Sequence, residues 1–266
     1  MKIFLSADIE GTCGIAHWDE TEQGKNGYQH FAEQMTREVA AACEGAADAG
    51  ATELLVKDAH DTARNLNPQA LPRCARIFRG WGRHPYSMMA GLDKSFDGAL
   101  FTGYHAWAGS DHNPLAHTMN LGVSELTING MPGSELLINC LTCAYEGVPT
   151  YFVSGDAGLC AWVRTVNPNI ATVPVSRGEG NGSISIHPDV AVERIRGAVA
   201  EALKGPREDY LFPLPESFEV EVRYRDHFAA KRAGFYPGAA QLGAHAVRYR
   251  ADDYFQVLTF FSFVLS

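Results

Sequence analysis

The chain begins Met1-Lys-Ile-Phe-Leu-Ser-Ala-Asp-Ile-Glu-Gly11. The apolar run 2–5 predicts a buried opening strand, and Asp8 and Glu10 follow where this strand ends. Side chains two positions apart in an extended chain point to the same side, so the two carboxylates would repel one another without a positive partner. Paired acids followed by Gly11, which permits a sharp turn, are typical of a cation site. The simpler interpretation is a solvated strand end.

The composition is that of an ordinary globular protein. The 266 residues are 46% hydrophobic and 20% charged. The net charge is −9, from 22 basic and 31 acidic residues, and the basic residues form no cluster, so we expect no nucleic-acid partner. The apolar tail 257–265 is too short to span a bilayer and predicts a buried strand or helix. Since no secretory signal precedes the first strand, we expect a cytoplasmic protein without a membrane partner.

Strands and helices alternate along the first part of the chain. Apolar runs at 52–58, 96–101 and 148–154 predict further strands, and apolar residues at helical spacing predict helices at 28–49 and 135–146. This order favours a mostly parallel sheet with helices on both faces. The sequence therefore predicts an α/β fold.

The pattern changes near residue 166, which divides the chain into two expected units. We expect a metal-binding α/β domain over residues 1–166 and a smaller C-terminal α/β domain over residues 167–266. Within the second unit, the glycine-rich stretch 178–183 predicts a flexible link. Helical spacing predicts a helix over 188–203, and regular alternation predicts a half-exposed antiparallel strand over 218–224.

The six cysteines are scattered through the chain and do not resemble a disulfide framework. Cys140 and Cys143 match C-x-x-C, the spacing of a redox motif. They fall, however, on the broad apolar face of the predicted helix 135–146. We therefore interpret them as buried helical residues rather than as a redox pair.

Two later strands are followed by histidines, His60 after the second predicted strand and His105 after the third. In open α/β sheets, ligands bind beyond the carboxyl ends of the strands, so we expect both imidazoles near Asp8 and Glu10. A single histidine at a strand end is commonly a structural, hydrogen-bonded residue. Imidazole and carboxylate groups from three strand ends together suit zinc, and also manganese or cobalt.

Three more residues have both a structural and a functional interpretation. Glu135 opens a predicted helix, where the helix dipole alone favours a carboxylate. His117 is either a simple loop histidine or a group that transfers a proton or stabilises an oxyanion, since imidazole changes charge near neutral pH. Asp61 either orients the imidazole of His60 or is a surface acid. The polar loop 12–29 is expected to cover the site.

The set of motifs resembles the zinc-dependent D-aminopeptidases of peptidase family M55. The match covers essentially the whole chain, and its motifs follow in the family's order at similar spacing: Ser6-x-Asp8-x-Glu10-Gly11, Asp58-Ala-His60, Gly103-Tyr-His105, His117-Thr118 and the turn 129–135. The resemblance implies a binuclear zinc site in which Asp8 bridges the two ions. The ligands that it implies are Asp8, Glu10, His60, His105 and Glu135, with His117 as the catalytic residue.

The same resemblance implies an activity and an assembly. The expected enzyme is a metallo-aminopeptidase that binds two Zn²⁺ per subunit and hydrolyses the N-terminal amide bond of short peptides through a metal-activated water. The peptides would contain D-amino acids, although the preference for D or L residues depends on pocket walls that the sequence does not specify. The family also implies a ring-like homo-oligomer with its active sites facing an enclosed space.

Two departures from the family pattern leave alternatives open. Ser134 stands where the family usually has glycine, and residues 174–183 lack the expected lysine-containing stretch. The alternatives are a related metal-dependent amidase or esterase with another substrate, and a non-catalytic metal-binding scaffold. Nucleotide binding is less favoured, because the stretch 11–14 (Gly-Thr-Cys-Gly) is not the G-x-G-x-x-G phosphate loop.

Overall fold

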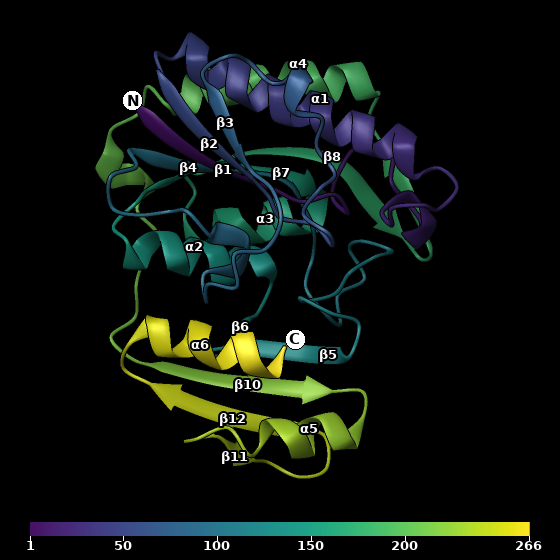
Figure 1. Cartoon of the computed structure of the whole chain (residues 1–266), viewed down its shortest axis with the longest axis vertical. Helices are drawn as coiled ribbons and strands as arrows, with labels where there is room; N and C mark the ends of the chain where they lie inside the picture. The colour runs from purple at the N-terminus through teal and green to yellow at the C-terminus, as the bar shows by residue number, and fades with distance from the viewer. Residues whose placement is uncertain (266) are drawn as a thin grey trace.

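The computed structural model describes residues 1–265, which form two β-sheets with flanking helices (Figure 1). The larger sheet has seven strands, parallel throughout except for the last, which pairs antiparallel with its neighbour. This arrangement confirms the predicted α/β fold with a mostly parallel sheet. The spatial order is β3 (Ala75–Phe78), β2 (Glu53–Asp58), β1 (Lys2–Ala7), β4 (Gly98–Tyr104), β7 (Thr150–Asp156), β8 (Ala171–Glu179) and β9 (Gly182–Ser185).

Helices cover both faces of the larger sheet because its central strands are apolar on both sides. In β1, Ile3 and Leu5 pack into one hydrophobic cluster and Phe4 packs into another. Two long helices lie on one face of the sheet and two shorter helices lie on the other (Figure 1). The first pair is α1 (Tyr28–Asp48) and α4 (Pro188–Ala202), and the second is α2 (Glu135–Tyr145) and α3 (Ala157–Val166).

The smaller sheet is antiparallel throughout. Its strands are, in spatial order, β11 (Ala240–Gln241), β12 (Ala246–Ala251), β10 (Phe218–Tyr224), β5 (Val123–Ile128) and β6 (Met131–Pro132). Strand β10 alternates between buried and partly exposed side chains, as its sequence predicts. The last helices are α5 (His227–Ala233) and α6 (Tyr254–Val264), so the apolar tail is helical; α6 lies between the smaller sheet and α2 (Figure 1). No helix within residues 1–265 is both long and apolar enough to cross a membrane.

The expected division at residue 166 does not coincide with the division between the sheets. Strands β5 and β6, which precede it, belong to the smaller sheet, and β8, β9 and α4, which follow it, complete the larger layer. One hydrophobic cluster also contains Phe101 and Leu137 from the larger unit together with Val222 and Phe260 from the smaller. The two sheets therefore share one hydrophobic cluster.

The stretch 178–183, which we expected to be a flexible link, forms a hairpin. Gly178 pairs with Ser183 and Glu179 pairs with Gly182 at the ends of β8 and β9. Gly180 supports the turn with a φ of 58°. The expectation was wrong because strand pairing needs backbone hydrogen bonds and not an apolar core of its own.

Candidate metal centre

The six site residues expected from the sequence lie together beyond one edge of the larger sheet. Asp8 and Glu10 follow β1, His60 follows β2, and His105 follows β4. Glu135 is the first residue of α2, and His117 lies in the connection between β4 and β5. Residues from five separate parts of the chain thus meet where parallel strands end, as open α/β sheets favour.

Close contact between the segments after β1 and β4 brings these residues together. The Gly11 N–H donates to the Gly103 carbonyl at 2.8 Å. A Cβ atom on Gly11 would lie 1.9 Å from the Tyr104 carbonyl oxygen, so any other residue would push the two segments apart. The expected turn is present, closed by a 2.8 Å hydrogen bond from the Thr12 N–H to the Ile9 carbonyl. It is the contact with Tyr104, however, that requires glycine.

Carboxylate oxygens and imidazole nitrogens face one another in a buried group. His60 Nδ1 lies 3.1 Å from Glu10 Oε2 and 3.4 Å from Asp8 Oδ1. His105 Nε2 lies 3.5 Å from Asp8 Oδ2 and 3.4 Å from Glu135 Oε2. None of these five residues is more than 8% exposed. Asp8 is therefore central, with one oxygen directed at each imidazole.

Backbone carbonyls fix the orientation of both imidazoles. His60 Nε2 donates to the Thr21 carbonyl at 2.8 Å, and His105 Nδ1 donates to the Ala106 carbonyl at 2.9 Å. A carbonyl only accepts, so each of these nitrogens carries a hydrogen, and the other nitrogen of each ring faces the carboxylates. The other nitrogen then presents a lone pair to carboxylate oxygens, which is favourable only with a cation or a proton between them. Imidazole ligands of metal ions are commonly held in this way.

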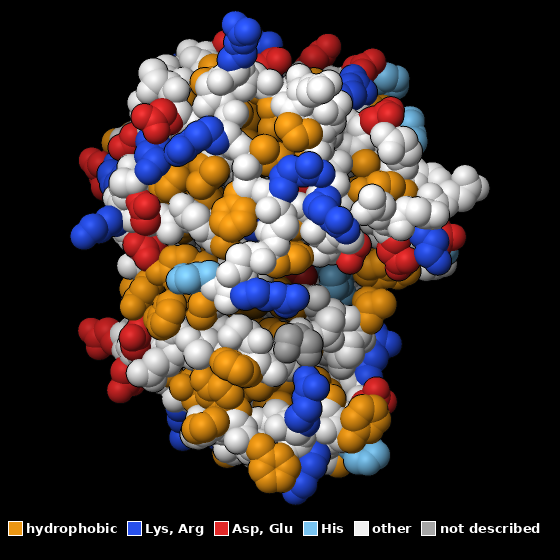
Figure 2. All heavy atoms as spheres, viewed as in Figure 1, with side chains coloured by type: hydrophobic (Ala, Val, Ile, Leu, Met, Phe, Trp, Pro, Cys, Tyr) orange, Lys and Arg blue, Asp and Glu red, His pale blue; other side chains and the backbone are white. Residues whose placement is uncertain are grey.

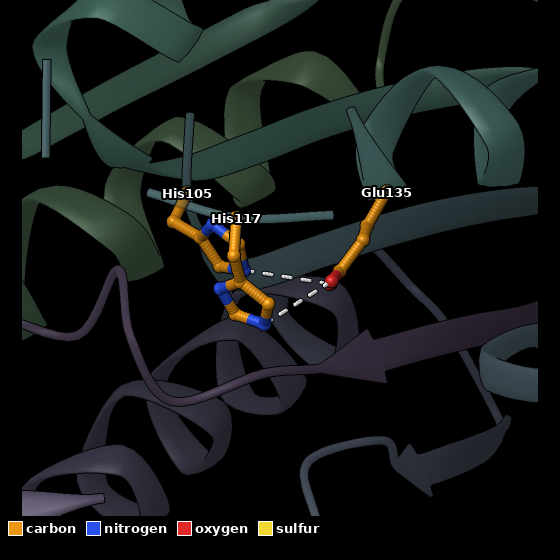
Figure 3. Close-up of side chains that lie close together, drawn as sticks. All are labelled: His105, His117 and Glu135. Carbon is orange, nitrogen blue, oxygen red and sulfur yellow. Dashed lines mark ion pairs between the residues drawn. The ribbon is translucent and has the colours of Figure 1, made fainter. Parts of the chain in front are cut away.

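His117 lies beside His105, and both imidazoles face the Glu135 carboxylate (Figure 3). Its ring stacks on that of His105, with centroids 4.4 Å apart and planes 10° from parallel, and its edge meets Trp18. His117 Nδ1 donates to the Leu115 carbonyl at 2.9 Å. This leaves His117 Nε2 free, 3.6 Å from Glu135 Oε1, able to accept a proton or to bind a cation.

Several polar atoms in the group have no hydrogen-bond partner among residues 1–265. They are Asp8 Oδ2, Glu10 Oε2 and His105 Nε2, all buried. Buried unpaired atoms cost free energy, and a bound cation would satisfy them together. Ligand atoms of two triads lie within 4.8 Å of one another, one triad being Asp8, Glu10 and His105 and the other His105, His117 and Glu135. Mixed nitrogen and oxygen donors fit zinc.

The charges shift the pKa values of the group strongly. Burial alone would lower the pKa of His60 and of His105. The charge of Glu10 nevertheless raises the pKa of His60 well above its usual value, and the charge of Glu135 does the same for His105. Burial alone would raise the pKa of both glutamates. The charge of His60 nevertheless lowers the pKa of Glu10, and the charge of His105 lowers the pKa of Glu135 to about 2. Burial and the neighbouring Glu10 raise the pKa of Asp8. Protons thus hold the metal-free group together, and a cation can replace them.

A cavity of about 1070 Å³ opens onto this group. Its walls come from residues 18–23, residues 81–88 and helix α6, in addition to the carboxylates and histidines. Figure 2 shows the hollow between the part of the molecule built on the larger sheet and the part built on the smaller sheet, with hydrophobic and basic side chains at its edges. The loop 12–29 therefore contributes a wall, as expected. The volume matches pockets that enclose small ligands.

The residues that support the His60 loop were given no role in the sequence analysis. Asp58 accepts hydrogen bonds from the backbone N–H and side-chain amide of Asn65, at 2.6 and 2.8 Å. The same Asn65 amide donates to the His60 carbonyl at 2.8 Å. Asp61, considered as a partner of His60, is exposed, and the His60 ring bonds to Thr21 instead. In the sequence, this support is indicated only by the acid that ends β2 and by a turn-favouring asparagine seven residues later.

Helix α2 presents Glu135 through an N-cap. Ser134 is fully buried, and its hydroxyl accepts a hydrogen bond from the Leu137 N–H at 3.0 Å. Serine at this position therefore stabilises the helix start that carries the carboxylate. Further along α2, Cys140 and Cys143 are free and buried, as predicted. Burial raises the pKa of Cys140 to about 12, which disfavours a reactive thiolate.

Comparison with known proteins agrees with this geometry. A family model described as D-aminopeptidase, Peptidase M55, matches residues 1–263. The D-aminopeptidase of Bacillus subtilis (strain 168) is 31% identical over 257 residues, covering 95% of this chain and 92% of that protein. A solved structure, described as the Zn-dependent D-aminopeptidase DppA from Bacillus subtilis, a self-compartmentalizing protease, has a TM-score of 0.92 and 29% identity, covering 99% of this chain and 96% of that one. This chain therefore belongs to the D-aminopeptidase family of hydrolases.

Proposed function

We propose that this protein is a zinc-dependent aminopeptidase that binds two zinc ions and removes the N-terminal residue of short D-amino-acid peptides. The observation that supports it most is the buried group in which unpaired carboxylate and imidazole atoms face one another. The resemblance to a Zn-dependent D-aminopeptidase supports zinc and the D configuration. The proposed ligands are Asp8, Glu10, His60, His105 and Glu135, with Asp8 between the two ions.

Asp8 is suited to a shared ligand by its position. Its Oδ1 faces His60 and its Oδ2 faces His105, so each oxygen can serve a different ion. When bound, zinc supplies a Lewis acid and lowers the pKa of a water to about 7. The carboxylates offset the metal charge and hold that end of the cavity ready for the substrate's amino group.

His117 is proposed to transfer the proton that the leaving amine requires. Its Nδ1 is held by the Leu115 carbonyl, so its Nε2 is the atom that accepts and then returns the proton. Glu135 Oε1, held by a 2.7 Å hydrogen bond from the Met119 N–H, keeps that nitrogen in place. The ring of Trp18 packs against that of His117, with centroids 5.3 Å apart, and the His117 side chain is only 12% exposed.

A homo-oligomer is the proposed assembly. The structural relative is described as a self-compartmentalizing protease, a description that involves several subunits around an enclosed space. In this chain, Phe228, Phe235 and Phe263 of the C-terminal part are 65%, 76% and 64% exposed, which subunit contacts would cover. We expect a ring located in the cytoplasm, to be checked by light scattering of the purified protein and by cell fractionation.

Metal removal tests the proposed activity. Dialysis against a chelator should abolish the hydrolysis of D-aminoacyl peptides, and zinc should restore it with two ions per chain by elemental analysis. A panel of D- and L-dipeptides, simple amides and esters separates the aminopeptidase from a related amidase or esterase. Undiminished hydrolysis after complete metal removal would contradict the proposal, and two bound zinc ions without any hydrolysis would favour a scaffold.

A further inference from the structure

The cavity is strongly asymmetric in charge. Among residues 1–265, Arg83 is the one lysine or arginine that lines it. Its acidic lining residues are Asp8, Glu10, Glu22, Asp61 and Glu135. A ligand that fills this cavity therefore meets several acidic side chains, the proposed metal ligands among them, and a single arginine.

The side chain of Arg83 has no partner within the described part of the chain. It is exposed and takes part in no hydrogen bond or ion pair, whereas six of the other arginines form ion pairs with carboxylates. Arginine binds carboxylates through two parallel hydrogen bonds, and this capacity is unused at Arg83. An unpaired arginine facing a ligand cavity in an acidic protein is available to a ligand anion.

The neighbouring histidine does not compete for this role. His84 Nδ1 accepts a hydrogen bond from the Tyr86 N–H at 3.2 Å, so that nitrogen carries no proton. Its ring also packs edge-on against Tyr86, with centroids 4.6 Å apart. Arg83 is thus the fixed positive charge of this wall.

The backbone that carries Arg83 is anchored before and after it. The Trp81 indole donates to the Asp61 carbonyl at 2.6 Å and lies 4.3 Å from the buried ammonium of Lys57. On the other side, the Ser87 N–H donates to the His84 carbonyl at 2.9 Å. Arg83 itself has a φ of 58°, a conformation that its neighbours must hold because it is unfavourable for a residue with a Cβ. The backbone of Arg83 is therefore held in place while its guanidinium stays available to a ligand.

We propose that Arg83 binds the C-terminal carboxylate of the substrate and selects short peptides with a free carboxyl end over their amides. This inference rests on the proposed function, because the amino group of the same peptide lies at the metal end. A short peptide carries one positive and one negative terminus, and the cavity offers the opposite charge to each. Both Arg83 and the buried carboxylates line this cavity, and its volume of about 1070 Å³ accommodates a peptide of few residues.

A pair of matched substrates tests the inference. The zinc-loaded enzyme is assayed with D-alanyl-glycine and with D-alanyl-glycinamide, which differ only in the carboxylate. In Arg83→Gln, kcat/KM for the acid should fall about 10- to 100-fold, the range expected for a charge-assisted hydrogen bond, while the value for the amide stays within about twofold. Arg83→Lys should lie between, because it keeps the charge and loses the paired hydrogen bonds.

Arg76→Gln is the matched control. Arg76 is exposed on β3, does not line the cavity, and its replacement changes the net charge by the same amount. It should leave the acid-to-amide ratio unchanged. An equal loss on both substrates in Arg83→Gln, or no loss on the acid, would overturn the inference.

Binding without turnover separates this inference from the proposed function. Calorimetric titration of the same two dipeptides into the zinc-loaded protein, in a His117→Ala background that suppresses turnover, should show weaker binding of the acid, and not of the amide, when Arg83→Gln is added. If the wild-type protein hydrolyses neither dipeptide but shows this selective binding, the aminopeptidase proposal fails and the role of Arg83 stands. Equal affinity of the wild type and Arg83→Gln for the acid overturns that role whatever the activity.

Discussion

The substitution Asp58→Asn examines how the loop after β2 positions His60. Asp58 is fully buried, and its Oδ2 accepts from the backbone N–H groups of Asn65 and Leu66, at 2.6 and 2.8 Å. Its Oδ1 accepts from the Asn65 side-chain amide at 2.8 Å, and that amide also holds the His60 carbonyl. The carboxylate therefore closes the loop, including Asp61 with its unfavourable φ of 44°.

The size of the effect follows from the number of hydrogen bonds that asparagine can keep. An amide oxygen can still accept from the two backbone N–H groups, but the new NH₂ group then faces the amide of Asn65, so donor meets donor. Loss of one charge-assisted hydrogen bond together with an unpaired buried donor costs about 3 kcal/mol. For a protein of this size, that lowers Tm by roughly 6–12 °C. Displacement of His60 should weaken zinc binding about 10- to 100-fold.

Two measurements check this prediction, thermal unfolding of the metal-free protein and competition for zinc against a coloured chelator. Asp61→Asn is the control, since it makes the same chemical change three residues further on at an exposed side chain. It should alter neither quantity appreciably. If Asp58→Asn matched the wild type in both Tm and zinc affinity, our view that this carboxylate positions His60 would be incorrect.

Substitutions at three further residues address other parts of the molecule. His117→Ala should lower kcat at least about a hundredfold with the zinc content unchanged, because a proton-transfer group is lost; loss of zinc in elemental analysis would make His117 a ligand instead. Ser134→Ala should cost about 1 kcal/mol in urea unfolding and Ser134→Gly only a few tenths, since glycine is tolerated at an N-cap; equal losses would speak against the cap. Burial raises the pKa of Glu38 from 4.5 to about 7, so the folded state binds the extra proton and stability falls as pH rises through this window. Glu38→Gln should remove that part of the pH dependence, gaining up to about 3 kcal/mol over the wild type at pH 8 and little at pH 4.5; a constant difference across this range would exclude Glu38 as its source.

The larger sheet and the position of the site could be predicted because both depend on local patterns. Apolar runs such as residues 2–5 identify buried strands, and strands alternating with helices form parallel sheets. The carboxyl ends of parallel strands lie at one edge, so residues directly after them, such as Asp8, His60 and His105, come together without further information. The residues of the candidate metal centre therefore lie in short segments whose local geometry depends little on the rest of the chain.

The membership of the smaller sheet could not be predicted in this way. Strand β5 precedes α2 and would by its order extend the parallel sheet, yet Leu126 pairs with Val222, almost a hundred residues later. Alternating side chains indicate a strand with one buried face and do not identify its partner. Pairing between distant segments is decided by packing, so the order of the strands in the chain does not reveal that β5 pairs with a strand beyond residue 166.

The same distinction explains why ligand atoms are easier to predict than specificity. The cavity facing Asp8 is closed by α6 at the other end of the chain, and Phe261 and Leu258 line it although no motif includes them. Arg83 acquires its importance only because every other lysine and arginine of residues 1–265 lies outside this cavity, a fact that no local pattern records. Residue types and spacing can thus indicate the chemistry at the metal end, whereas the choice of substrate depends on walls that separate parts of the chain build together. A substitution at Arg83 should accordingly change which peptides are cleaved without changing the chemistry of the cleavage.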